Sequence, residues 1–248
     1  MSAVLLAVSG VSKHFMGLRA VDDVSLSVNK GEIVSIIGPN GAGKTTFFNL
    51  LTGQLAPTSG DVRLRGVQIN RLAPHDRARL GMGRTFQIAK PLIALTALEN
   101  VMIGAFMRHP KLSTARDKAM AVLEKVGLVQ HARRRAGELT LSERRRLEVA
   151  RALALEPEIM LLDEVMAGLN QSEVGQAIEL LKSLHVEGLT FLIIEHNLKV
   201  VRAFSERVVV LDRGRMIAEG SADQILSSPE VVKAYLGEGH QVAELEML

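Results

Sequence analysis

The sequence of 248 residues contains no cysteine, no tryptophan and a single tyrosine. Without cysteine the chain can form neither a disulfide framework nor a thiolate metal site. Its longest apolar runs fall short of the ~20 residues that a membrane-spanning helix requires, so a role at a membrane would need a partner protein. The apolar run at residues 3–8 is short and lacks a positively charged leader. It is expected to form a strand rather than a secretory signal.

Charge of one sign is also scarce. Lys and Arg number 30 and Asp and Glu number 27, which gives a formal net charge of +3. This balance favours no acidic partner such as a nucleic acid, and the arginine runs at 133–135 and 144–146 are expected to be solvated helix faces. Hydrophobic residues make up 47% of the chain, which excludes a disordered protein. The length suits one domain, or one domain with a subdomain.

The stretch that organises the chain is residues 36–46, with the sequence IIGPNGAGKTT. Gly38, Gly43, Lys44 and Thr45 fill the P-loop pattern G-x-x-x-x-G-K-[ST], in which backbone N–H groups wrap a phosphate because no side chain intrudes. Lys44 would reach the β- and γ-phosphates, Thr45 would ligate Mg²⁺, and the N-terminus of the following helix adds a favourable partial charge. The residues expected to line the nucleotide are Gly38, Asn40, Gly41, Ala42, Gly43, Lys44, Thr45 and Thr46.

The alternative is a glycine-rich turn that fits the pattern by accident. The context disfavours it, because residues 33–37 read as a buried strand and residues 46–51 have helical spacing, as a strand–loop–helix unit requires.

A second apolar strand, residues 159–162, ends in the carboxylates Asp163 and Glu164. In a P-loop protein Asp163 would hold Mg²⁺, often through water, and Glu164 would orient or deprotonate the attacking water. Acidic residues at a strand end are common. Their pairing with a P-loop about 120 residues upstream makes the catalytic interpretation the stronger one.

Three single residues carry weaker signals. Phe15 lies on a short connection between predicted strands at 5–11 and 21–28, where it could stack on a base or equally plug the core. Gln87 ends a predicted strand at 84–87 and could reach Mg²⁺. His196 follows a buried strand at 190–194, where doubly wound sheets place their ligands, although a histidine by itself is more often structural.

Residues 91–155 have an almost wholly helical composition, and this insert separates two α/β halves. Thr96 with Glu99, and Thr140 with Glu143, each form a capping box that predicts a helix start. The exposed side of the insert is a candidate docking surface, although apolar stripes more often face a core. The residues expected on the apolar faces of two of its helices are Leu98, Met102, Ala105 and Phe106, and Ala119, Val122, Leu123 and Val126. Hairpins are predicted at 61–69 and 207–219.

Taken in order, these motifs resemble the motif series of ABC-transporter ATPase subunits over nearly the whole chain. The series consists of Phe15, residues 38–46, Gln87, the helix start at 139–145, Asp163 with Glu164, residues 167–170, and His196. The resemblance implies an α/β P-loop NTPase (RecA-like) core, residues 1–88 and 157–237, with an antiparallel β subdomain. It also implies an inserted α-helical subdomain, residues 89–156, and a tail at 238–248.

The resemblance assigns roles to the weaker residues. In that family the aromatic residue stacks on adenine, the glutamine meets Mg²⁺ and senses the membrane partner, and the histidine contacts the γ-phosphate. Phe15, Gln87 and His196 occupy these positions. Lys44, Glu164 and His196 are then the catalytic residues, Thr45, Gln87 and Asp163 serve the metal, and the cofactors are ATP and Mg²⁺.

The finer pattern is similar to the ATPases of branched-chain amino acid importers. It is carried by residues 15–21, 83–87, 147–153, 167–170, 194–197 and 234–238. That subgroup also serves related amides and urea. The resemblance implies integral-membrane permease subunits, a second ATPase subunit in a head-to-tail dimer and, indirectly, a solute-binding protein. The chain would then lie at the cytoplasmic, inner face of the plasma membrane.

The signature motif of the family, usually LSGGQ, stands here as LTLSE at residues 139–143. In the head-to-tail dimer, Thr140, Ser142 and Glu143 would face the γ-phosphate of ATP that the other subunit binds. Leu141 replaces a glycine, and Glu143 brings a carboxylate near a polyanion, which is unfavourable unless a neighbour such as Arg144 or Arg145 offsets it. The composite ATP site is therefore expected to be weakened. Milder departures are valine for proline at 165 and asparagine for aspartate at 170.

Other functions remain open at this point. An ATPase for another cargo, such as lipopolysaccharide export, shares much of this pattern. A soluble ABC protein of DNA repair or translation usually carries a long coiled-coil insertion or two cassettes, which this chain lacks. A plain P-loop kinase would not need Asp163 and Glu164 followed by residues 167–170 and His196.

Overall fold

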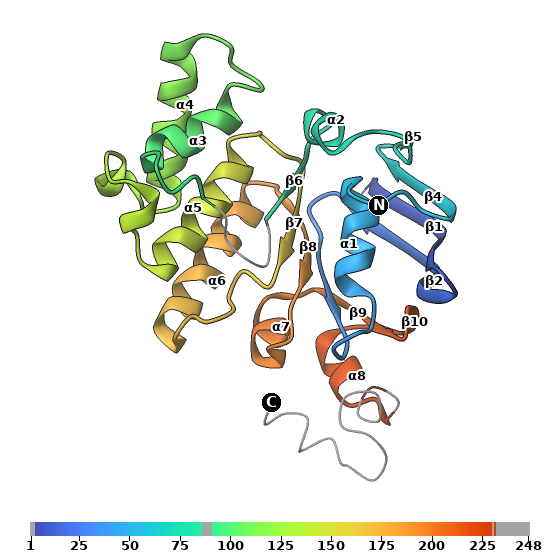
Figure 1. The fold of residues 1–248 in the computed structure, drawn as a ribbon. Helices are drawn as coiled ribbons and strands as arrows, with labels where there is room; N and C mark the ends of the chain where they lie inside the picture. The colour runs from blue at the N-terminus through green and yellow to red at the C-terminus, as the bar shows by residue number, and fades with distance from the viewer. Residues whose placement is uncertain (1–2, 86–90, 230, 232–248) are drawn as a thin grey trace. The chain divides into compact units, whose positions relative to one another are not determined.

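The computed structural model describes residues 3–85, 91–229 and 231, and it divides the chain into two compact units. The first unit comprises residues 1–77 and 190–248, and the second comprises residues 78–189. Figure 1 shows the elements of both units, coloured along the chain.

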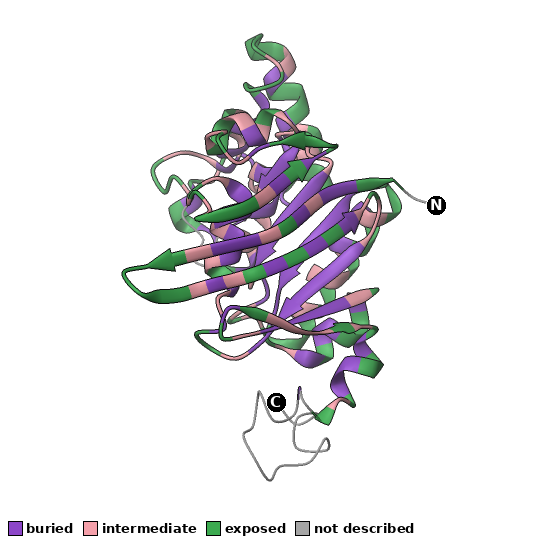
Figure 2. Cartoon of the chain, turned by 90° about the vertical axis from the view of Figure 1, so that its right-hand side faces the viewer, coloured by how far each residue is buried: buried purple, intermediate pink, exposed green. Residues whose placement is uncertain are grey.

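The first unit contains an antiparallel sheet in the order β2-β1-β4-β5. Burial alternates along β2, where Val24, Leu26 and Val28 are buried between more exposed neighbours, as expected for a sheet that is buried on one face. Figure 2 shows this alternation as bands along the long strands. The strands are β1 (Val4–Phe15), β2 (Leu18–Asn29), β4 (Ser59–Leu64) and β5 (Val67–Gln68).

The second sheet of this unit is largely parallel. Strand β3 (Ile33–Ile37) pairs in parallel with β8 (Thr190–Ile194) and with β9 (Arg207–Asp212), and β10 (Arg215–Gly220) is antiparallel to β9. Every residue of β3 and β8 is buried, which explains why all but Ser35 and Thr190 are apolar.

Short helices follow these strands. Helix α1 (Lys44–Thr52) starts directly after the P-loop and ends at Gly53, whose left-handed φ of 79° closes the last turn. Apolar side chains of α7 and α8 pack against Ile37, Val208 and Val210 and build the core on one side of the sheet. The helices are α7 (Leu198–Phe204) and α8 (Ala222–Leu226), and α2 (Pro74–Arg79) lies where the chain leaves the first unit.

The second unit holds a parallel strand pair and most of the helices. Strand β6 (Met82–Arg84) pairs with β7 (Ile159–Asp163). Both predicted capping boxes are present, so Thr96 and Thr140 begin helices α3 and α5, and Asn170 with Glu173 forms a third box that begins α6. The helices are α3 (Ala97–Ala105), α4 (Leu112–Lys125), α5 (Leu141–Leu153) and α6 (Gln171–Val186), with 3₁₀ turns at Val129–His131 and Ala136–Glu138.

Three details of the sequence-based prediction were wrong. The first two strands extend to a tight turn at Met16 and Gly17, so Phe15 ends β1 instead of lying on a connection. Strand β6 covers residues 82–84 and so begins earlier than the predicted strand at 84–87, of which residues 86 and 87 lie outside the described residues. Gly83 of this strand packs on Pro157, where an added Cβ would lie 3.2 Å from the proline ring.

The third wrong detail concerns the buried face of α3. Ala105 is buried as predicted, but Phe106 is exposed, and Leu98 and Met102 are only half-buried. The other buried residues of this face are Ala97, Val101 and Gly104. The face is set by close approach to α5, because a Cβ at Gly104 would lie only 2.7 Å from the carbonyl oxygen of Arg151. Small residues therefore mark this interface, and an apolar pattern based on large side chains misses it.

Within the described ranges, no helix has both the length and the apolarity needed to cross a membrane.

Candidate functional site

The phosphate-binding loop depends on two glycines that no other residue could replace without moving the backbone. Gly38 has φ 149° and Gly43 has φ 97°, both in the region that L-residues rarely adopt. A Cβ at Gly38 would lie 2.1 Å from the carbonyl oxygen of Leu211, and one at Gly43 would lie 2.3 Å from that of Ala20. The glycines therefore keep the loop in contact with the strands beneath it, and their missing side chains leave the cradle that a phosphate needs.

Lys44 stands at the start of α1, with its side chain folded over this loop. The residue is 8% exposed, and its Nζ donates to the carbonyl oxygens of Gly38 at 2.5 Å and Pro39 at 3.0 Å. The first turn of α1 contains no acidic side chain. The loop thus combines a buried ammonium group with a helix N-terminus, an arrangement that attracts an anion.

His196 lies at the same edge of the sheet as the P-loop. Because β3 and β8 run parallel, with Ile36 opposite Ile194, the loop after β3 and the residues after β8 leave the sheet at one edge. His196 is exposed there, and Asn197 caps α7 by accepting from the N–H groups of Lys199 and Val200 at 3.0 and 3.3 Å. This edge is where open α/β sheets bind ligands, so the position predicted for His196 is consistent with contact to a nucleotide.

Phe15 ends β1 with 40% of its surface exposed, so its ring is not the core plug that the sequence left open. The Nζ of Lys13 lies 5.2 Å from the ring centroid, within the range of a cation–π contact. An exposed aromatic ring beside a cation can stack on a base.

In the second unit, Asp163 is the last residue of β7 and is 2% exposed. The Nη2 of Arg84 lies 3.5 Å from its Oδ2, and the Asp163 N–H donates to the Thr85 hydroxyl at 3.3 Å. Burial lowers the pKa of the Arg84 guanidinium, and the Asp163 carboxylate opposes this shift. Arg84 and Thr85 were not predicted as partners of Asp163, and the pairing of β6 with β7 brings them beside it.

Glu164 follows the strand in a left-handed conformation with φ 49°, which is uncommon for a residue with a side chain. Its carbonyl oxygen accepts from the N–H of Ala167 at 3.1 Å, so a tight turn follows at once. Such outliers cluster at functional sites, where the surrounding structure maintains them.

The N-terminus of α5 carries the departures from the signature motif. Glu143 accepts from the Thr140 N–H at 2.8 Å through Oε2, and its Oε1 lies 3.0 Å from His131 Nε2 and 4.0 Å from Arg134 Nη1. Burial favours the neutral form of Glu143, but the Thr140 hydrogen bond, His131 and Arg134 together hold the pKa of its carboxyl below the usual value. Leu141 is 49% exposed, with its side chain against Gly168.

The arginines expected to offset Glu143 are engaged elsewhere. Arg144 donates to the carbonyl oxygens of Leu139 and Gly137 at 2.9 and 2.7 Å, and Arg145 lies 3.9 Å from Glu148. The Arg144 contacts fix the start of α5 to the 3₁₀ turn before it. His131 and Arg134 are the groups beside the Glu143 carboxylate, although the arginine run that includes Arg134 was expected to be only a solvated helix face.

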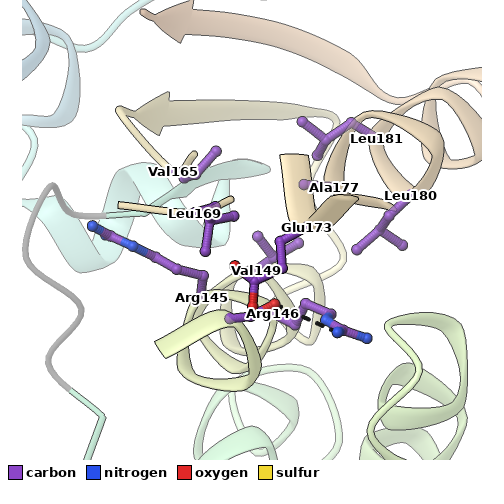
Figure 3. Close-up of a pocket in the computed structure, with 10 residues that line it drawn as sticks. Arg145, Arg146, Val149, Val165, Leu169, Glu173, Ala177, Leu180 and Leu181 are labelled. Carbon is purple, nitrogen blue, oxygen red and sulfur yellow. Dashed lines mark hydrogen bonds between the residues drawn. The ribbon is translucent and has the colours of Figure 1, made fainter. Parts of the chain in front are cut away.

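An apolar groove runs between α5 and α6 (Figure 3). Val149, Leu181, Val165 and Leu169 are among its lining residues, and the last two belong to the segment that follows Glu164. Arg145 and Arg146 border it, with their guanidinium groups extending away from it on opposite sides. The groove therefore connects the helix of the signature residues to the segment after Glu164.

Gln87 and residues 234–248 lie outside the described residues, so the structure gives no position for them. The chemistry of the donors in each unit suits the expected cofactors. In the first unit the glycine cradle fits a phosphate and Thr45 offers a hydroxyl oxygen, and in the second unit Asp163 offers carboxylate oxygens, the kind of ligand that Mg²⁺ prefers. Among the residues whose placement is known, no cluster of three or more His, Asp or Glu side chains could hold a metal alone.

Comparison with known proteins places these features in a family. Residues 21–167 match the family model "ABC transporter", and residues 215–241 match "Branched-chain amino acid ATP-binding cassette transporter". The high-affinity branched-chain amino acid transport ATP-binding protein LivG of Salmonella typhimurium is 41% identical over 257 residues, covering 96% of this chain and all of the relative. The corresponding protein BraF of Pseudomonas aeruginosa is 41% identical over 254 residues with the same coverage.

Solved structures agree. A nucleotide-free ATP-binding cassette from an ABC transporter superposes with a TM-score of 0.88 at 35% identity, covering 95% of this chain and 100% of that one. A dimeric cassette bound to ADP and Pi, in a post-hydrolysis state, gives a TM-score of 0.80 at 29% identity, covering 88% and 99%. The fold predicted from the sequence is thereby confirmed, and the chain belongs to the ABC transporter family as an ATP-binding and ATP-hydrolysing subunit.

Proposed function

We propose that this chain hydrolyses MgATP to power the import of branched-chain amino acids or related small polar solutes. The observation that carries the ATPase part is the glycine cradle with Lys44 folded over it and His196 at the same sheet edge. The cargo rests on the similarity to LivG and BraF over almost the full length of the chain.

In this mechanism, the loop amides and Lys44 hold the β- and γ-phosphates and stabilise the charge that develops during transfer. Glu164 orients the attacking water and accepts its proton, while His196 holds the γ-phosphate in line. Phe15 stacks on adenine. Bound Mg²⁺ would neutralise phosphate charge, with Thr45, Gln87 and Asp163 as its protein ligands or their water-mediated partners.

The partners follow from the same proposal. A second ATPase subunit would complete each ATP site through Thr140, Ser142 and Glu143, and permease subunits would hold the pair at the cytoplasmic face of the membrane, where a solute-binding protein delivers cargo from the other side. Ile103, Phe106 and Met107 are between 39% and 45% exposed. Their spacing places them on one face at the end of α3, where they form a candidate permease-docking surface.

Leu141 places an exposed side chain where the family has glycine, which opposes close approach of a phosphate. We retain the proposal that the composite site is weakened, with Leu141 as the cause.

Uptake of radiolabelled leucine by cells that lack the endogenous copy tests the proposal. Wild-type protein and the matched control Glu179→Gln, whose side chain is exposed on α6, are expected to restore uptake. Glu164→Gln is expected not to restore it. If uptake in cells lacking the protein equals that of wild-type cells while the purified protein hydrolyses ATP, the cargo assignment is wrong and the ATPase assignment stands.

A further inference from the structure

The carboxylate of Glu143 is the feature of this chain that conflicts most with its expected role. A helix N-terminus that receives a γ-phosphate should not present a second anion, because two negative charges close together repel each other. The Glu143 side chain is nevertheless only 15% exposed, and it is held at three points, by Thr140, His131 and Arg134. Those contacts decide where the charge lies and what balances it.

His131 lies between Arg134 and Glu143. Arg134 Nη1 lies 3.3 Å from His131 Nδ1, and Nε2 of the same ring lies 3.0 Å from Glu143 Oε1. Arg134 Nη1 also lies 4.0 Å from Glu143 Oε1. His131 therefore bridges Arg134 and the Glu143 carboxylate.

Arg134 is itself anchored. Its Nη2 donates to the carbonyl oxygen of Glu138 at 2.6 Å, at the end of the 3₁₀ turn that leads into α5. Arg134, His131 and Glu143 thus form a chain of hydrogen bonds that starts at a fixed backbone atom. The other charged groups nearby, Arg144 and Arg145, are directed to Leu139, Gly137 and Glu148.

We propose that His131 and Arg134 are positioning residues that hold and balance Glu143, so that this signature segment still accepts the γ-phosphate of ATP bound by a second copy of the chain. The proposal rests on the head-to-tail arrangement under Proposed function. It separates the two departures from the motif: the charge of Glu143 is compensated within the chain, whereas the exposed side chain of Leu141 is not.

A double-mutant cycle tests this pairing, with ATP-driven dimerisation of Glu164→Gln protein measured by light scattering over a range of concentrations. Glu143→Gln alone gives the reference dissociation constant of a dimer in which no charge at position 143 needs to be balanced. His131→Ala and, separately, Arg134→Ala are each expected to weaken the dimer about tenfold, because the Glu143 carboxylate is then left unbalanced beside the phosphate. Adding Glu143→Gln to either variant is expected to bring the dissociation constant back to that of Glu143→Gln alone, because the charge needing compensation is gone.

The matched control is His109→Ala. His109 Nε2 lies 2.9 Å from Glu156 Oε1, with a side chain exposed to the same extent as that of His131, in the same unit but at the C-terminal end of α5 rather than at its start. Its loss is expected to leave dimerisation unchanged. A purely structural role for His131 would weaken the dimer without rescue by Glu143→Gln, and thermal unfolding of each variant shows whether it is folded.

The proposal is overturned if Glu143→Gln alone strengthens the dimer about tenfold, because Glu143 would then be uncompensated. It is also overturned if the doubly substituted proteins remain as weak as His131→Ala or Arg134→Ala. Binding of a fluorescent ATP analogue is measured in parallel. Retained ATP binding with no dimer in any variant overturns the proposal alone, whereas absent ATP binding overturns the proposed function as well.

Discussion

At the scale of single residues, the nucleotide site depends on two positions that have no side chain. Gly38 and Gly43 combine a left-handed or otherwise restricted φ with close neighbours, Leu211 and Ala20. The need for glycine falls within one short stretch of sequence, so the P-loop motif could be recognised from the sequence. The contacts of the loop with residues on β2 and β9, which cause this need, could not.

Gly43→Ala is expected to lower ATP affinity at least about 100-fold. The added Cβ would meet the Ala20 carbonyl oxygen and displace the loop from its phosphate-binding form, and a displacement of about 1 Å at a functional site can cost a factor of this size. The control is Gly188→Ala, which has a similar φ of 95° but no atom within 4 Å of the added Cβ. This control shows the effect of the left-handed backbone strain alone, which is about 1–2 kcal/mol for a residue with a Cβ. Fluorescent-nucleotide titration measures both, and equal ATP affinity in the two variants would contradict this explanation.

The pair of Arg84 and Asp163 makes a second prediction at this scale. Both side chains are almost fully buried, at 8% and 2% exposure. Arg84→Met should lower the free energy of unfolding by about 3–5 kcal/mol, because it leaves a buried carboxylate without its cation. Lys182→Met, which breaks the exposed pair with Glu179 on α6, should cost no more than about 1 kcal/mol. Urea unfolding distinguishes them, and equal losses would refute the role of burial.

These residues show what sequence reasoning could reach. Asp163 and Glu164 were identified because carboxylates after a buried strand have a known use in P-loop proteins. Arg84 was missed because it lies 79 positions before Asp163, and only the pairing of β6 with β7 brings the two together. His131 was missed for a similar reason: its relation to Glu143 depends on a 3₁₀ turn that has no strong sequence pattern.

At the scale of helices and strands, local chemistry predicted helix starts better than it predicted buried faces. Thr96 and Thr140 were identified as N-caps because a capping box is formed within four residues. The buried face of α3 was mispredicted because Gly104 packs on α5, a contact that depends on tertiary structure. Strand β1 proved longer than its apolar pattern because pairing with β2 continues through polar residues up to Phe15 and Leu18.

The ion pair that links the start of β9 to the residue before β3 predicts that the stability of the fold depends on pH. Arg207, which opens β9, donates to both oxygens of Glu32, just before β3, at 2.7 and 3.0 Å. Although burial raises the pKa of Glu32, the bonds from Arg207 and from the Asn29 N–H hold it below the usual value of 4.5. The stabilisation is therefore complete above about pH 4.5 and is lost as the pH falls through the lowered folded-state pKa.

Glu32→Gln is accordingly expected to reduce the free energy of unfolding by about 1.5–3 kcal/mol at pH 7, the range for hydrogen bonds to charged groups. The difference from wild type should shrink as the pH falls below 4.5. Urea unfolding at pH 7, 5 and 3.5 measures it. A constant difference across this range would show that ionised Glu32 does not contribute in this way.

At the scale of the whole molecule, the order of the motifs was more informative than any one of them. Phe15, Gln87 and His196 were each ambiguous alone, but their order with the P-loop and Asp163 matched one family. The division into units could not be read from composition, because residues 78–88 and 157–189, expected in the core, belong to the second unit without a change of pattern. The cargo depends on partner proteins, so this chain can only suggest it through its relatives.

The central claim is that the P-loop binds ATP and that Glu164 activates the attacking water. The most direct test compares nucleotide binding and phosphate release in the same preparations of wild-type protein and Glu164→Gln with Mg²⁺. ATP affinity is expected to stay within about threefold, and turnover is expected to fall by about 10²–10⁴, the usual contribution of a general base. Near-normal phosphate release by Glu164→Gln would contradict the assignment of the base.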